Sequence, residues 1–173
     1  MKLAKLATRA LVGGLFVGHG TQKLKGWFGG PGIEGTAGMM ESLGLHPARS
    51  NAYAAGAAES AGGALLGLGL ATPLASSALV GVMTTAIRKV HAPNGPWVSG
   101  GGWEYNAVLI AVALAFAETG PGEASLDHLF GTEKKGFGYA LGAGALGVAG
   151  SFLTTELASR AAPPAPAAPG RPG

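Results

Sequence analysis

The sequence lacks cysteine and is poor in charge. Its 173 residues contain no cysteine, which excludes disulfide bonds, thiolate metal sites and Cys-x-x-Cys redox chemistry. Any electron transfer by this protein must therefore use a bound cofactor or a partner. Charged residues make up 12% of the chain and hydrophobic residues 47%, whereas a soluble domain carries about 25% charged residues. This composition predicts a small integral membrane protein.

Clusters of basic residues are also absent, although the formal net charge is +3. The twelve lysines and arginines occur singly or in pairs beside apolar runs, and they form no basic stripe of the kind that binds nucleic acid. Cationic side chains commonly flank membrane helices at the level of the lipid head groups. We therefore expect a lipid bilayer as the partner of this chain and exclude nucleic acid.

The four histidines do not form a recognisable metal-binding motif. Neither a His-x-x-His nor a His-Glu-x-x-His spacing occurs, so no pair of imidazoles is placed on one helix face for a metal or haem. A nucleophile–base pattern and a nucleotide-binding fingerprint are missing as well. The sequence therefore predicts no metal site and identifies no catalytic residue, and it leaves open whether the protein is an enzyme.

Five apolar runs dominate what is present. A spanning helix needs about 20 mostly apolar residues, which the second and fifth runs supply alone and the others supply with flanking polar residues. The alternative, a soluble helical bundle, would need polar helix faces that these runs lack. We predict an all-α integral membrane bundle of four antiparallel transmembrane helices followed by a fifth helix. The runs are residues 3–24, 52–70, 74–87, 103–117 and 137–153.

This prediction divides the chain into three parts. Residues 1–130 form the four-helix membrane domain, with a short surface helix at 33–43 between the first two spans. Residues 131–160 add the fifth apolar helix. Residues 161–173 are rich in alanine and proline and cannot build a core, so we predict a disordered tail.

Polar residues gather on one side of the predicted bundle. Because consecutive helices alternate in direction, the ends of the first and third runs share a side with the starts of the second and fourth. His19 and Lys23 are four residues apart and therefore lie on one face of the first helix. We predict a polar, ligand-binding cluster on this side. Its candidate residues are His19, Gln22, Lys23, Glu59, Arg88, His91, Asn94, Glu104 and Tyr105.

Glu59 is the strongest single candidate, because it is the one charged residue inside the second run. A carboxylate within a spanning helix costs about 2.5–3.5 kcal/mol, so it usually faces the bundle interior and has a partner. Gly56 and Gly63 lie on the same helix face and would allow close packing there. We predict that Glu59 pairs with Arg88 or His19.

Several short motifs, in order and spacing, are similar to one known family. They are His19-Gly-Thr-Gln-Lys23, Gly26-Trp-Phe-Gly-Gly-Pro-Gly32, Glu59-Ser-Ala-Gly-Gly63, Val90-His-Ala-Pro-Asn-Gly95 and Ser125-Leu-Asp127. Over about residues 6–130 the chain resembles the DoxX family of small bacterial membrane proteins. The resemblance implies a four-helix bundle in the bacterial cytoplasmic membrane. It also implies association with thiosulfate:quinone oxidoreductase subunits and with other membrane redox complexes.

Two functions follow from these observations. The first is a membrane subunit of a redox-linked complex whose polar cluster binds a quinone head group or a small oxyanion. Lys23, Arg88 and His91 would supply positive charge and hydrogen bonds, and His19 with Glu59 would relay protons. The second is a non-catalytic membrane scaffold or docking subunit, in which the same polar cluster only stabilises the bundle.

Overall fold

The computed structural model describes residues 2–161, and within this range the chain consists of helices and loops without a β-strand. The prediction of an all-α protein is therefore confirmed. The predicted tail, from residue 162 onward, lies outside the described residues. The longer helices are α1 (Lys2–Lys25), α2 (Gly32–Ser42), α3 (Ala48–Leu68), α4 (Thr72–Ala86), α5 (Glu104–Thr119) and α7 (Phe137–Arg160). The short elements are η1 (Trp27–Gly29), η2 (Ile87–His91), η3 (Ala92–Asn94), η4 (Val98–Gly100) and α6 (Leu126–Leu129).

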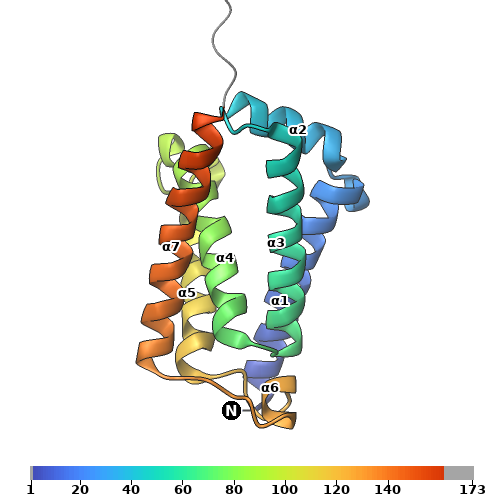
Figure 1. Cartoon of the computed structure of the whole chain (residues 1–173). Helices are drawn as coiled ribbons and strands as arrows, with labels where there is room; N and C mark the ends of the chain where they lie inside the picture. The colour runs from blue at the N-terminus through green and yellow to red at the C-terminus, as the bar shows by residue number, and fades with distance from the viewer. Residues whose placement is uncertain (1, 162–173) are drawn as a thin grey trace, which may run out of the picture.

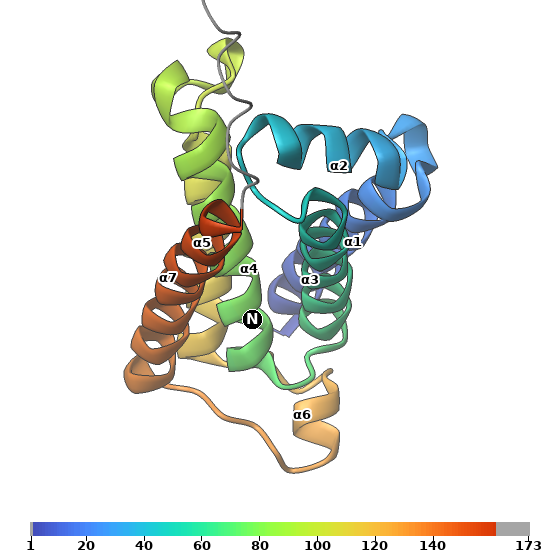
Figure 2. The same cartoon turned by 45° about the horizontal axis from the view of Figure 1, so that its top comes forward.

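Five long helices stand side by side with alternating direction, and α2 lies across one end (Figures 1 and 2). α1 packs along α3, while α4, α5 and α7 form a second group that contacts α3 through α4. The end that carries α2 also holds the α4–α5 connection and the last turn of α7, and we call it the α2 end. The opposite end holds the α3–α4 turn and the α5–α7 connection with α6, and we call it the α6 end. This alternation puts the predicted polar residues on the side expected from the sequence.

Only one of the five long helices is apolar enough to span a membrane by its own length and composition. Within residues 2–161 that helix is α7. α4 and α5 have 15 and 16 residues, fewer than the roughly 17–25 that a span requires. α1 has lysines near both of its ends, and α3 contains Glu59 among many alanines and glycines. Four of the five predicted spans thus lack this support, including the second run, which was expected to span without flanking residues.

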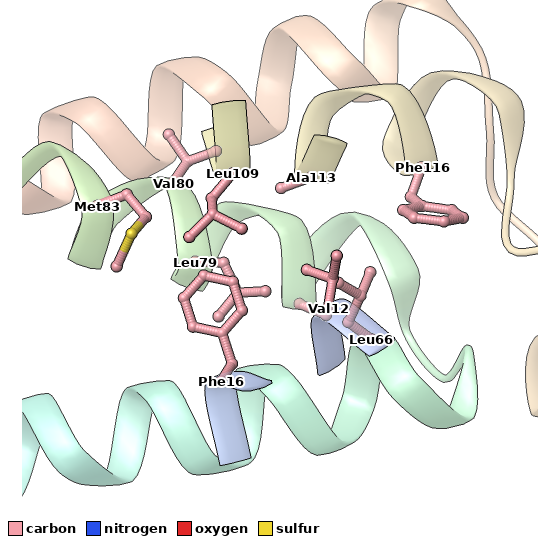
Figure 3. Close-up of a cluster of buried hydrophobic side chains, with 10 residues drawn as sticks. Val12, Phe16, Leu66, Leu79, Val80, Met83, Leu109, Ala113 and Phe116 are labelled. Carbon is pink, nitrogen blue, oxygen red and sulfur yellow. The ribbon is translucent and has the colours of Figure 1, made fainter. Parts of the chain in front are cut away.

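Among residues 2–161, the larger of two apolar core clusters joins the two helix groups (Figure 3). Phe16 of α1 and Leu66 of α3 pack against Leu79 of α4 and Leu109 of α5, and all four side chains are buried. α7 contributes no residue to this core. It contacts α4 instead through small residues, where a Cβ on Gly147 would come within 2.7 Å of the Ser77 carbonyl oxygen.

Large apolar side chains also cover the outside of the bundle. Leu11 of α1, Leu74 of α4 and Leu146 of α7 are 64%, 66% and 68% exposed. Such side chains occur along several helices rather than in one small patch. Extended apolar surface of this kind is typical of a protein that faces lipid.

Glycine allows α1 and α3 to pack closely. A Cβ on Gly13 would lie 2.6 Å from the Gly63 carbonyl oxygen and 2.7 Å from the Gly67 Cα, and both of these are backbone atoms. A Cβ on Gly14, the next residue along the same helix, would have no neighbour within 4 Å. The two glycines therefore form a matched pair for testing the crossing.

The variant Gly13→Ala is expected to lower the stability of the bundle by about 1–3 kcal/mol, because the two backbones must move apart to admit the methyl group. The variant Gly14→Ala should be neutral or slightly stabilising, since alanine favours a helix by about 1 kcal/mol over glycine. Thermal unfolding of the purified protein in detergent measures both. Equal melting temperatures for the two variants would show that α1 and α3 are not in contact at Gly13.

Candidate functional site

A cavity of about 650 Å³ lies between α2, α3, α4 and α7. Its walls are mainly small or apolar residues, and Met40 and Leu45 cover it near α2. The backbone amide of His46 donates a hydrogen bond to the Ala158 carbonyl at 3.0 Å, which ties the α2–α3 loop to the last turns of α7. Leu146, an exposed residue near the middle of α7, also lines the cavity. The cavity therefore opens toward the outside of the bundle at this level.

An ion pair between α1 and α3 forms one polar wall of this cavity. Lys23 Nζ lies 2.6 Å from Glu59 Oε2, and both residues line the cavity. The Glu59 side chain is 4% exposed and the Lys23 side chain 22%. The Thr36 hydroxyl of α2 donates to the Lys23 carbonyl at 3.2 Å and so fixes the last turn of α1. A carboxylate buried at this depth is matched by a cation from the neighbouring helix.

Hydroxyl groups and a guanidinium form the facing wall, between α4 and α7. Arg88 Nη1 donates to Ser151 Oγ at 3.1 Å and to Thr155 Oγ1 at 3.3 Å. The Arg88 Cζ also lies 3.4 Å from the centre of the Phe152 ring, a cation–π contact. Thr85 Oγ1 lies 2.8 Å from Ser151 Oγ. Thr85, Ser151 and Thr155 all line the cavity.

The last turn before the α4–α5 loop widens into the π-helix η2, which carries Arg88, Lys89 and His91. Such wide turns are frequent at functional sites, because they change the direction of the side chains that follow. Lys89 and His91 both line the cavity. Among residues 2–161, no carboxylate lies within ion-pair distance of Arg88 or Lys89. The α2 end of the cavity therefore carries an excess of positive charge.

The structure separates the nine predicted residues into two sets. Lys23, Glu59 and His91 line the cavity, and Arg88 does not line it but donates to the lining hydroxyls Ser151 and Thr155. The other five lie outside it. His19 Nδ1 and Gln22 Oε1 are 3.1 Å apart near the end of α1. Asn94 Nδ2 donates to the Gly101 carbonyl at 3.2 Å, and Glu104 accepts a hydrogen bond from the Val98 amide, so both stabilise the α4–α5 loop. Tyr105 is exposed.

The predicted pairing of Glu59 with Arg88 or His19 is wrong, because the partner of Glu59 is Lys23. His19 is exposed and points away from the face of α1 that contacts α3. Lys23 lies one turn nearer the end of α1, and its side chain is long enough to reach Glu59 on α3. Arg88 is held on the facing wall by the hydroxyls of α7.

Sequence reasoning missed the contribution of α7 to this site. Ser151 and Thr155 are buried and face the cavity from a helix that was expected only to add a fifth span. Their spacing of four residues places two hydroxyls on one face of an otherwise apolar run. That spacing is the signal that could have identified them.

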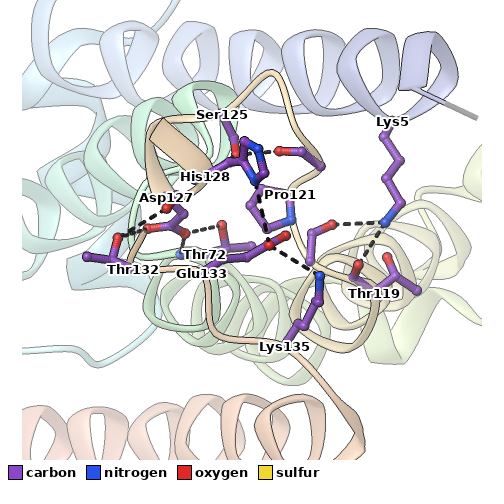
Figure 4. Close-up of polar contacts among 12 residues, drawn as sticks. Lys5, Thr72, Thr119, Pro121, Ser125, Asp127, His128, Thr132, Glu133 and Lys135 are labelled. Atoms are coloured by element: carbon purple, nitrogen blue, oxygen red, sulfur yellow. Dashed lines mark hydrogen bonds and ion pairs between the residues drawn. The ribbon is translucent and has the colours of Figure 1, made fainter. Parts of the chain in front are cut away.

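A second buried polar cluster lies at the α6 end. The Arg9 guanidinium is 2% exposed and donates to the carbonyl oxygens of Gly67 at 3.0 Å, Pro121 at 2.8 Å and Ala124. Asp127 accepts hydrogen bonds from the Ala71 amide, the Thr72 amide and hydroxyl, and the Thr132 hydroxyl (Figure 4). Each group holds the α5–α7 connection against the α3–α4 turn. This cluster is fully hydrogen-bonded and stabilises the fold.

Replacing Asp127 with asparagine is expected to lower the stability at neutral pH by about 1–3 kcal/mol. Burial raises the pKa of the Asp127 carboxyl, but hydrogen bonds from Thr72, Ala71 and Thr132 outweigh it, so the pKa lies below its ordinary value of 3.8. The unfolded chain therefore binds this proton more tightly than the folded chain. The stabilisation is complete above about pH 4 and is lost as the pH falls through the lowered pKa.

Melting temperatures of the wild type and Asp127→Asn, measured in detergent from about pH 7 down to about pH 3, test this. The wild-type advantage should shrink below about pH 4. An advantage that stays constant over the whole range would contradict the role given to the carboxylate.

Comparison with known proteins gives one match. The DoxX family model matches residues 4–92, which is half of the chain. The matched region runs from α1 through η2 and contains Lys23, Glu59, Arg88 and His91, whereas α5, α6 and α7 follow it. No curated protein and no solved structure matches the chain.

Proposed function

The chain belongs to the DoxX family, whose members are membrane proteins, and from this premise we propose that it is a multi-pass subunit of a redox-linked complex in the bacterial cytoplasmic membrane. In this proposal the cavity between α3, α4 and α7 binds a quinone head group. One observation carries it: the cavity has an apolar body that opens toward the lipid-facing surface, and its charged groups lie toward the α2 end. An amphiphile with a compact polar head fits this arrangement.

The residues around the cavity match the hydrogen-bonding needs of a quinone. Its two carbonyl oxygens accept hydrogen bonds, and Lys89, together with Lys23 where it faces the cavity, can donate them. When bound, a quinone supplies two-electron, two-proton redox chemistry. The cation Lys89, which lines the cavity, favours negative charge that develops on the ring.

His91 is suited to exchange a proton with the ligand. Its Nδ1 lies 2.7 Å from the Gly101 carbonyl, which can only accept a hydrogen bond, so Nδ1 carries the proton. In the neutral imidazole Nε2 is then free to accept one. Since His91 lines the cavity, this acceptor is available to a bound head group.

A small oxyanion is the second candidate ligand. The observation that favours it is the excess positive charge at Arg88 and Lys89, which no carboxylate of the described chain neutralises. The two ligands differ in the contacts that they need. An oxyanion binds through the cations and makes no favourable contact with the apolar part of the cavity. Binding measurements separate them.

The test is a titration of the purified protein, in lipid nanodiscs, with a short-tailed ubiquinone analogue and separately with thiosulfate. Lys89→Ala is expected to weaken quinone binding about tenfold, the effect of one charged hydrogen bond. Lys25→Ala is the matched control, because Lys25 lies in the same part of the bundle but does not line the cavity. Saturable binding of thiosulfate alone would favour the oxyanion, and no saturable binding of either ligand would overturn the proposal.

A further inference from the structure

A second cavity of about 510 Å³ lies nearer the α6 end, between the start of α4, the first half of α7 and the loop at 127–134. Leu70, Pro73, Leu74 and Tyr139 make its lining mainly apolar. Ser77 of α4 and Leu146 of α7 line both this cavity and the larger one. The two cavities therefore share these two residues as lining.

Together the cavities follow α4 along most of its length. Pro73 lines the second cavity and His91 lines the first, and they are 18 residues apart on a continuous helical segment. At 1.5 Å per residue this is about 27 Å, close to the ~30 Å thickness of a membrane's hydrocarbon core. Leu74 and Leu146 are exposed, so the second cavity also opens on the outer surface.

The one carboxylate that lines the second cavity is already occupied. Both carboxylate oxygens of Asp127 accept hydrogen bonds from Ala71, Thr72 and Thr132. Lys134 is exposed at the rim. Most of the remaining lining is apolar, with Ser77, Lys134 and Tyr139 as the exceptions, so this cavity suits a hydrocarbon chain better than a second head group.

We propose that the two cavities form one groove for a long-chain quinone. The head group lies between Lys23 and Lys89, and the isoprenoid tail passes Ser77 and Leu146 into the second cavity. This inference rests on the proposed function and extends it, since it names long-tailed isoprenoid quinones as the ligand class. A groove that follows α4 for most of the membrane thickness is longer than a quinone head group. The part that the head group does not fill can hold the tail.

Photo-crosslinking in nanodiscs tests the inference with two probes of equal tail length, one with an azide on the quinone ring and one with a diazirine at the tail end. The ring probe should label peptides that contain residues 54–59 or 81–91. The tail probe should label peptides that contain residues 70–77 or 127–143. Excess native long-chain quinone should remove both labels.

The possible outcomes distinguish the long-tail groove from the proposed function of head-group binding. Ring labelling in the groove, with tail labelling spread over the lipid-facing surface, would overturn the long-tail groove and leave the proposed function standing. Failure of both probes to label any of these peptides would overturn both claims. Tail labelling that excess phospholipid removes and excess quinone does not would identify the occupant of the second cavity as a lipid chain.

The variant Leu146→Trp narrows the space where the two cavities share a wall and is expected to reduce tail labelling of residues 70–77 about fivefold or more. Leu141→Trp is the matched control, since Leu141 is an exposed leucine of the same helix that lines neither cavity. Equal tail labelling in the two variants would overturn the path past Leu146.

Discussion

The variant Lys23→Met is expected to destabilise the protein by about 3–5 kcal/mol, because it leaves the buried Glu59 carboxylate without its cation. Glu59 is almost fully buried, and its Oε2 lies 2.6 Å from the Lys23 ammonium group. Thermal unfolding in detergent, or the urea concentration at the unfolding midpoint, measures the loss. The same variant should also lose quinone binding, since one wall of the polar end of the cavity loses its cation.

The double variant Lys23→Met/Glu59→Leu separates the two effects. Removing both charges together is often neutral for stability, because the cost of burying them disappears as well. We expect the double variant to recover most of the melting temperature and none of the quinone binding. If it recovers both, the ion pair stabilises the bundle without taking part in ligand binding.

The variant Arg9→Met is expected to cost at least as much, about 4–9 kcal/mol, for a different reason. The buried guanidinium donates to three carbonyl oxygens, on Gly67, Pro121 and Ala124. Each hydrogen bond from a charged group contributes about 1.5–3 kcal/mol, and methionine leaves all three acceptors without a donor. The loop that follows α5 should then become sensitive to protease before the bundle melts, and limited proteolysis detects this.

Lys5→Met is the matched control for Arg9. Lys5 lies one turn earlier on α1 and donates to the Thr119 carbonyl at 2.7 Å, but this bond is exposed to solvent. Its loss should change the melting temperature little, since exposed interactions contribute under about 1 kcal/mol. If the two variants lower the melting temperature by similar amounts, burial of Arg9 does not determine its contribution to stability.

Helix positions were accessible from the sequence, because each apolar run is bounded by glycine, proline or polar residues. The run at 103–117 corresponds to α5, which begins at Glu104, and the predicted surface helix at 33–43 corresponds to α2. The antiparallel order followed from the prediction that consecutive runs each span the same membrane. α6 was missed, because a four-residue helix has no hydrophobic period to detect.

The site was only partly accessible, because it depends on which helix pairs are in contact. Glu59 could be recognised as a buried carboxylate from its cost within an apolar run. Its partner could not, since Lys23 and His19 lie on adjacent turns of α1, and the glycine-mediated crossing with α3 decides between them. The role of Ser151 depended on α7 packing beside α4, and nothing local to residues 137–160 specifies that neighbour.

The functional interpretation changed with the geometry as well. The sequence placed nine polar residues in one cluster, and the structure puts His19, Gln22, Asn94, Glu104 and Tyr105 outside the cavity. The proposed function assigns proton exchange to His91 instead of His19 with Glu59, because the Gly101 carbonyl holds His91 Nδ1. The hydroxyls of Thr85, Ser151 and Thr155 complete the facing wall.

An experimental density map of the full-length protein, purified from its own membrane into nanodiscs, tests the central claim most directly. The account predicts ring-shaped density between the Lys23–Glu59 pair and the α4–α7 wall, within hydrogen-bonding distance of Lys89 or His91. Quinone extracted from the same sample should approach one molecule per chain. A map in which α3 closes onto α7 and leaves no cavity, with no quinone in the extract, would contradict it.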